Sequence, residues 1–280
     1  MTSSDDGSPA AGGSPAAGGS PAAGGSPAAG GSPAAGNDSP APAGLVWFDE
    51  SSPQRAKERL DRGRIVAAAI QLADQELTGE ITMRALAARL GVRSPMALYR
   101  YVGSKDGLSD LMADEIYGEI TVPAGEGWRP ALHGLGTSGW AAVRRHPWFA
   151  RLAFSRPPLG PSAVTMYDTA LAELEPLELD AAARMGFVST VLGHVFGSGL
   201  ALLEEQAMRA RTGLTADKDL SAAAAPYLER IAASGKHPHF SRWAADPRRH
   251  EPMPQTFERI LDWLLDGLKA SLGSGPDSGE

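Results

Sequence analysis

Residues 82–105 have the sequence Thr82-Met-Arg-Ala-Leu-Ala-Ala-Arg-Leu-Gly-Val-Arg-Ser-Pro-Met-Ala-Leu-Tyr-Arg-Tyr-Val-Gly-Ser-Lys105. Thr82 is a good N-cap for a short helix, Met83–Leu90, which the following glycine ends. Ser94 caps a second helix, Pro95–Val102, whose first residue is a proline. Two short helices joined by a glycine turn predict a helix-turn-helix motif, whose second helix fits the major groove of DNA.

Helices on both sides of the motif give it a core. Before it, Ile65, Ala69 and Leu72 recur at helical spacing; after it, Ser104 caps a helix over Lys105–Ile120. The motif then has outward-facing residues that can bind bases, because arginine pairs with guanine and apolar side chains touch the thymine methyl. They are Arg84, Arg93, Ser94, Met96, Arg100 and Tyr101, with Tyr99 and Lys105 placed for phosphate oxygens.

The charge distribution decides between this interpretation and an ordinary helical bundle that contains a similar turn. The whole chain carries a net charge of −7, which argues against nucleic acid. Residues 55–105, however, hold ten Lys and Arg against five acids, and residues 106–280 are net acidic. A basic module on an acidic body favours DNA binding through the module alone.

The rest of the chain predicts an all-α fold with terminal segments that do not fold. Residues 7–36 are five copies of GSPAAG, which cannot bury enough apolar surface to become ordered. We expect a disordered tail over residues 1–44, a DNA-binding domain over 45–122, a helical ligand-binding and dimerisation domain over 123–273, and a disordered end over 274–280. Residues 236–254, rich in Pro and His, predict a long loop.

Two bulk features bear on location. The chain has no cysteine and no secretory signal, which favours a cytoplasmic protein. Met185–Leu203 lacks charged residues and contains Gly193-x-x-x-Gly197, a pattern also found in membrane helices. Because this segment holds His194 and several Ser and Thr, we favour a buried helix of a protein that is not in a membrane.

The motif and its neighbours resemble the DNA-binding domain of the TetR family of transcriptional repressors. The resemblance rests on Arg64-Ile-Val-Ala-Ala-Ala-Ile, on residues 82–92 and on Leu98-Tyr-Arg-Tyr-Val-Gly-Ser-Lys-Asp-Gly-Leu108. The acidic part resembles the tetracycline-repressor type of C-terminal domain in Arg145-His-Pro-Trp148, in Ser155-Arg-Pro-Pro-Leu-Gly-Pro161 and in the apolar repeat that begins at Phe257. Together the two cover about four-fifths of the chain.

The resemblance extends the set of expected DNA contacts. They become Thr82, Met83, Arg84, Arg93, Ser94, Pro95, Met96, Ala97, Tyr99, Arg100, Tyr101 and Lys105. Between Val92 and Leu98 the chain has one residue more than is usual in the family, which leaves open which of residues 93–96 faces the bases.

The resemblance also implies a homodimer and a small-molecule effector, here of unknown identity. The candidate dimer helices are 180–205 and 256–272, the second with the apolar face Phe257, Ile260, Leu261, Leu264, Leu265 and Leu268; the alternative is that they are internal core helices. An effector pocket would lie within residues 128–210. Its candidate wall residues, each of which can equally be plain core, are Trp140, His146, Phe149, Tyr167, Met185, Phe187, His194 and Met208.

No catalytic pattern is present, so we expect no enzyme and no cofactor. His237-Pro-His239 has no nearby carboxylate and does not predict a metal site. The leading hypothesis is a repressor that binds a palindromic operator in double-stranded DNA as a homodimer and is released by a small, mainly apolar effector. The alternatives are a regulator without small-molecule control, an activator, or a helical scaffold or enzyme with a vestigial DNA-binding motif.

Overall fold

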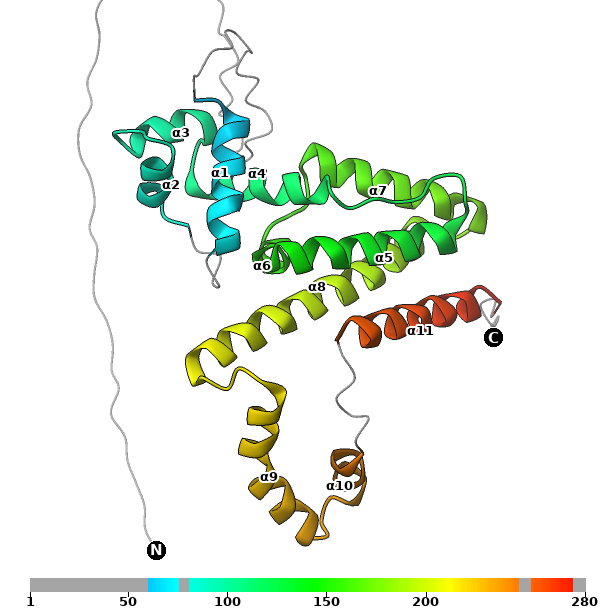
Figure 1. The fold of residues 1–280 in the computed structure, drawn as a ribbon. Helices are drawn as coiled ribbons and strands as arrows, with labels where there is room; N and C mark the ends of the chain where they lie inside the picture. Colours follow the sequence, from blue (N-terminus) through cyan, green and yellow to red (C-terminus); the bar gives the residue numbers. More distant parts are fainter. Residues whose placement is uncertain (1–59, 76–80, 247–252, 274–280) are drawn as a thin grey trace, which may run out of the picture. The chain divides into compact units, whose positions relative to one another are not determined.

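A computed structural model describes residues 60–75, 81–246 and 253–273, and within them the chain is helical, without a strand (Figure 1). The expected all-α fold is therefore confirmed. The tail over 1–44 and the end over 274–280 lie outside the described residues. The helices are α1 (Arg62–Gln75), α2 (Met83–Arg89), α3 (Met96–Val102), α4 (Lys105–Tyr117), α5 (Trp128–Arg145), α6 (Pro147–Ser155), α7 (Pro161–Leu174), the short 3-10 helix η2 (Glu175–Leu177), α8 (Ala181–Thr212), α9 (Asp217–Ala233), α10 (Pro238–Ala245) and α11 (Met253–Gly273).

Local capping sets the ends of the helices in the motif. The hydroxyl of Thr82 accepts a hydrogen bond from the Ala85 amide, and that of Ser104 accepts one from the Gly107 amide. Helix α3 begins at Met96, one residue later than expected, and the Ser94 hydroxyl accepts from the Met96 amide at 3.3 Å. These side-chain oxygens satisfy amides that no helical carbonyl can reach.

Helices α1 to α4 pack around a shared apolar core. Ile65 of α1, Leu86 of α2 and Leu98 and Val102 of α3 are fully buried. Helix α1 packs against α2, α3 and α4. Helix α3, only seven residues long, therefore depends on burial of one face for its stability.

Helices α5 to α8 and α11 pack together, and their buried side chains continue the same apolar core. Helix α8 packs against both α5 and α6, and α11 packs against α5 and α8 (Figure 1). Close approach requires small residues here, because a Cβ atom on Gly136 would meet the side chains of Leu261 and Val191. Helix α8 is apolar and long enough to cross a membrane, but Val188, Val191 and Val195 are fully buried within the chain. This packing favours a core helix.

The prediction of a long loop over residues 236–254 was wrong in part, because α10 lies within it. Pro238 is at the first helical position, where a proline is compatible with a helix. The rings of Phe240 and Trp243, three residues apart, pack with centroids 5.4 Å apart. The prolines and histidines of residues 236–254 predict a loop, whereas Pro238 starts a helix.

Two substitutions in α3 test its dependence on burial. Leu98→Ala removes a side chain that is 0% exposed, and we expect it to lower the free energy of unfolding by about 2–5 kcal/mol. Met96→Ala changes a side chain that is 70% exposed and serves as the control, with an expected change within about 0.5 kcal/mol. Denaturant unfolding measures both; equal losses would contradict the packing of α3 described above.

Candidate nucleic-acid interface and cavity

Most of the residues expected to contact DNA are on the surface of the motif. Helix α2 exposes Arg84 at its start, and α3 exposes Arg100. Lys105 is the exposed first residue of α4. The full exposed set is Thr82, Arg84, Arg93, Ser94, Met96, Arg100 and Lys105. Cationic side chains and helix starts thus occur together, an arrangement suited to phosphate oxygens.

The other expected contacts are partly or fully covered. Met83 is 8% exposed and belongs to the core, so its side chain is not on the surface predicted for DNA. Its position at a helix start did not reveal that it is one of the residues closing the core. Pro95, Ala97, Tyr99 and Tyr101 are half-buried, and both tyrosines pack against the core.

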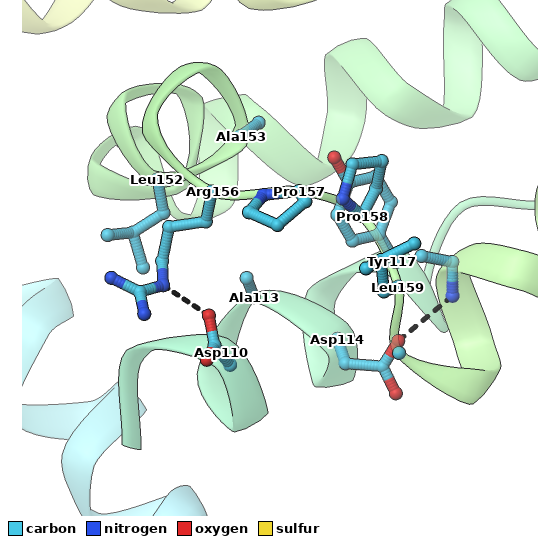
Figure 2. A pocket seen from close by; sticks show the side chains of 12 residues that line it. Asp110, Ala113, Asp114, Tyr117, Leu152, Ala153, Arg156, Pro157, Pro158 and Leu159 are labelled. Carbon is cyan, nitrogen blue, oxygen red and sulfur yellow. Dashed lines mark hydrogen bonds and ion pairs between the residues drawn. The ribbon is translucent and has the colours of Figure 1, made fainter. Parts of the chain in front are cut away.

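Acidic side chains along α4 join the helix-turn-helix motif to the helices that follow it. These helices, α5 to α8 and α11, are called the body of the chain below. Asp110 binds the Arg156 guanidinium, and Asp106 lies 3.3 Å from it. These contacts raise the pKa of Arg156 above its ordinary value, mainly through the hydrogen bond to Asp110. The guanidinium therefore stays charged and connects α4 to the segment after α6 (Figure 2).

Asp114, one turn further along α4, is buried and caps α7. Its carboxylate accepts hydrogen bonds from the Ser162 amide at 3.2 Å and from the Ala163 amide at 2.9 Å. One dashed line in Figure 2 marks a hydrogen bond of Asp114. A carboxylate at a helix start also interacts favourably with the helix dipole. Gly160 leaves room for this carboxylate, because a Cβ atom there would overlap it.

Sequence reasoning did not assign a role to Asp110, Asp114 or Arg156. The only available signal was the segment 155–161, which was used for the family resemblance. The structure explains two of its residues, since Arg156 binds α4 and Gly160 makes space for Asp114.

A cavity of about 500 Å³ opens beside the C-terminal end of α4, between that end and α7. Apolar side chains and hydroxyl groups share its wall. It is lined by Tyr117, Gly118, Ile120, Thr121, Val122, Pro161, Ser162, Thr165, Met166 and Thr169. Burial, with additional effects of Tyr167 and Asp114, raises the pKa of the Tyr117 phenol well above its ordinary value, so its hydroxyl stays a donor at neutral pH.

The residues expected to form the effector pocket lie elsewhere. None of the eight candidates lines this cavity or the small one under Pro157 and Pro158. They are Trp140, His146, Phe149, Tyr167, Met185, Phe187, His194 and Met208. Most of them are in the core or at its edge.

Ring contacts account for five of these residues. Phe257 stacks on both Trp140 and His194, with ring centroids 4.6 and 4.4 Å apart. Phe149 packs edge-on against Tyr117, and His146 against Trp148. Phe187 contacts Trp128 in the same way. Tyr167 and Met208 are half-buried, and Met185 is exposed.

The apolar face of α11 is divided between the chain's own core and its surface. Phe257, Leu261 and Leu265, three of the expected dimer residues, are 0% exposed within the single chain. They are therefore core residues, as the alternative interpretation had it. The other three, Ile260, Leu264 and Leu268, are only half-buried and remain partly accessible.

A protein-family model described as "Tetracyclin repressor-like, C-terminal domain" matches residues 122–272, more than half of the chain. The chain belongs to the TetR family of transcriptional regulators. It is 37% identical over 229 residues to the HTH-type transcriptional repressor DrrR1 of Streptomyces coeruleorubidus, a match that covers 80% of this chain and 83% of that protein.

Solved structures of the family have the same fold. Apo ActR from Streptomyces coelicolor superposes with a TM-score of 0.64 at 25% identity, covering 77% of this chain and all of that one. ActR in complex with actinorhodin gives the same TM-score at 26% identity and the same coverage. The expected membership of the TetR family, whose proteins bind DNA through a helix-turn-helix, is therefore confirmed.

The capping role of Asp114 can be tested by removing it. Asp114→Ala leaves two amides at the start of α7 without their acceptor, and we expect the free energy of unfolding to fall by about 1–3 kcal/mol. Asp168→Ala, at an exposed position of the same helix, is the control and should change it by no more than about 0.5 kcal/mol. Indistinguishable denaturation curves for the two variants would contradict the assignment.

Proposed function

We propose that this chain is a ligand-responsive repressor that binds a palindromic operator as a homodimer and leaves it when a small effector binds. One observation carries the proposal: α4 begins at exposed Lys105 beside the recognition helix and ends at Tyr117 in the wall of the cavity. A single helix therefore links a basic surface to a space of ligand size. Its relatives support the repressor role, since DrrR1 bears that name.

The DNA contacts proposed for this chain are those expected from its sequence, apart from the side chain of Met83. Arg84, Arg93 and Arg100 would reach base edges or phosphates, and Lys105 a phosphate. In a dimer the two recognition helices would enter successive major grooves, about 34–36 Å apart. The acidic remainder of the chain repels the DNA backbone, which confines contact to the basic module.

The effector would bind in the cavity beside Tyr117. Ile120, Val122 and Met166 offer apolar contacts, while the Thr165 and Thr169 hydroxyls and the Tyr117 phenol offer hydrogen bonds. This lining fits a mainly apolar molecule with a few oxygen atoms. Ligand binding releases DNA only if the effector has a higher affinity for the conformation in which α4 is displaced. The ActR complex with actinorhodin supports control by a small molecule.

Two adjacent helix surfaces support the homodimer. Exposed small residues recur along α8 at Ser189, Gly193, Gly197 and Ala201, which allows close approach of a second helix. On α11, Trp263 is 61% exposed, and its neighbours Ile260 and Leu264 are half-buried. These surfaces, rather than the three buried leucine and phenylalanine positions, are the proposed interface. We also propose that the protein acts in the cytoplasm and is not an enzyme.

Selection from randomised duplex DNA, followed by titration at several salt concentrations, tests operator binding. Lys105→Gln should lower the slope of log affinity against log salt by about 1, because one phosphate contact and its released counterion are lost. Lys269→Gln, exposed on α11, is the matched control and should leave the slope unchanged. If the wild-type chain selects no sequence, the repressor proposal is wrong and the scaffold alternative gains support.

A substitution that fills the cavity tests effector control, with actinorhodin as the first probe. Thr165→Trp places a large ring at the cavity wall and should raise the actinorhodin concentration needed for half-release of the selected duplex about tenfold or more. Val164→Trp, at the adjacent exposed position outside the cavity, should behave as wild type. Equal effects of the two variants would contradict this location of the effector site. If no compound of a panel releases the wild-type chain from the duplex, a regulator without small-molecule control is favoured.

A further inference from the structure

The carboxylate of Asp74, in the last turn of α1, contacts two side chains from the corner between α5 and α6. Its Oδ1 atom accepts a hydrogen bond from the Trp148 indole Nε1 at 2.7 Å. The same atom lies 2.7 Å from Nδ1 of His146, which donates to it because an ionised carboxylate has no proton to give. The residues are more than seventy positions apart in the sequence, so the contact joins the DNA-binding helices to the body.

The partners of Asp74 are held rigidly. His146 and Trp148 are 5% and 4% exposed, and they flank Pro147, which fixes the backbone at the start of α6. On its other side, Nε2 of His146 lies 3.4 Å from Glu119, just beyond α4, and Glu119 also binds Arg145. The end of α1, the segment after α4 and the α5–α6 corner therefore meet at one buried imidazole.

This contact is a second attachment between the motif and the body. The first is α4, which continues directly from the motif and is joined to the body by Asp110 and Asp114. A module attached through one helix alone can still turn about that helix. A second attachment at the end of α1, which also packs on α6, removes this rotation.

We infer that Asp74, His146 and Trp148 are positioning residues that fix the orientation of the DNA-binding helices on the body and thereby the spacing of operator half-sites that the dimer accepts. The inference rests on the proposed operator binding by a dimer. None of the three residues is in the exposed set that would touch DNA, so each acts through the placement of α3. These contacts of Asp74 with His146 and Trp148 are called the Asp74 joint below. Loss of the joint leaves the affinity for a single half-site unchanged and lowers only the affinity for two half-sites bound at the same time.

The experiment compares half-site spacing between variants of the full-length chain. The probes are the duplex that the wild-type chain selects, the same duplex with one or two base pairs inserted between its half-sites, and a duplex with a single half-site. Each inserted base pair rotates one half-site by about 35° relative to the other. We expect the wild-type chain to lose about a hundredfold in affinity on insertion. Asp74→Ala should bind the selected duplex about tenfold more weakly, lose less than about tenfold on insertion, and keep wild-type affinity for the single half-site.

Two further variants separate positioning from folding. Glu115→Ala removes a carboxylate from the exposed face of α4 and should keep the wild-type dependence on spacing. Trp148→Phe keeps an aromatic ring in place and removes only the indole donor, so it should flatten the dependence even if Asp74→Ala does not fold. The inference is overturned if folded Asp74→Ala or Trp148→Phe keeps the wild-type dependence of affinity on half-site spacing. It is also overturned if either variant loses as much affinity for the single half-site as for the selected duplex. Absence of any selected duplex for the wild-type chain instead overturns the proposed function.

Discussion

The carboxylates along one side of α4 hold this helix against the segment from Arg156 to the start of α7, and so join the helix-turn-helix motif to the rest of the chain. Asp106 and Asp110 bind Arg156, and Asp114 caps α7. The helix has thirteen residues, about 20 Å at the usual rise, so one rigid element extends from the recognition helix to the cavity. Because Asp110 and Asp114 are mostly or fully buried, their contacts resist displacement more than surface contacts of the same geometry would. Helix α4 therefore both carries the exposed residues of the motif at its start and forms one wall of the cavity at its end.

The parts of the fold that could be predicted are those that depend on local chemistry. Thr82 and Ser104 mark helix starts because a hydroxyl satisfies amides three residues away, and the structure has both caps. The basic module could be located because charge is visible in the sequence. Long-range pairing is not visible in the same way: nothing near Asp110 indicates an arginine forty-six residues later, and nothing near Asp74 indicates His146.

Apolar periodicity and residue type do not determine what covers a side chain, and two expectations depended on this. Apolar periodicity in α11 identifies a buried face but not what covers it, and the structure divides that face between its own core, at Phe257, and the surface, near Trp263. The residues expected in the pocket are aromatic or polar side chains on apolar helices. Side chains of this kind also pack against one another, as Trp140, Phe257 and His194 do. The cavity instead depends on how the end of α4 meets α7, which single-helix patterns do not encode.

The arrangement also limits how much free energy an effector must supply. Coupling between two sites in proteins is typically about 1–3 kcal/mol, and a hydrogen bond to a charged group contributes about 1.5–3 kcal/mol. Ser162 both lines the cavity and donates its amide to Asp114, so a ligand that displaced Ser162 would weaken a contact that holds α4. The free energy of that one hydrogen bond is similar to a typical coupling free energy between two sites, so its loss could account for release of DNA. The joint at Asp74 acts differently, since none of Asp74, His146 and Trp148 lines the cavity, and it holds the end of α1 rather than α4. Release through the cavity therefore requires a displacement of α4 that either breaks the Asp74 joint or carries α1 and the α5–α6 corner with it.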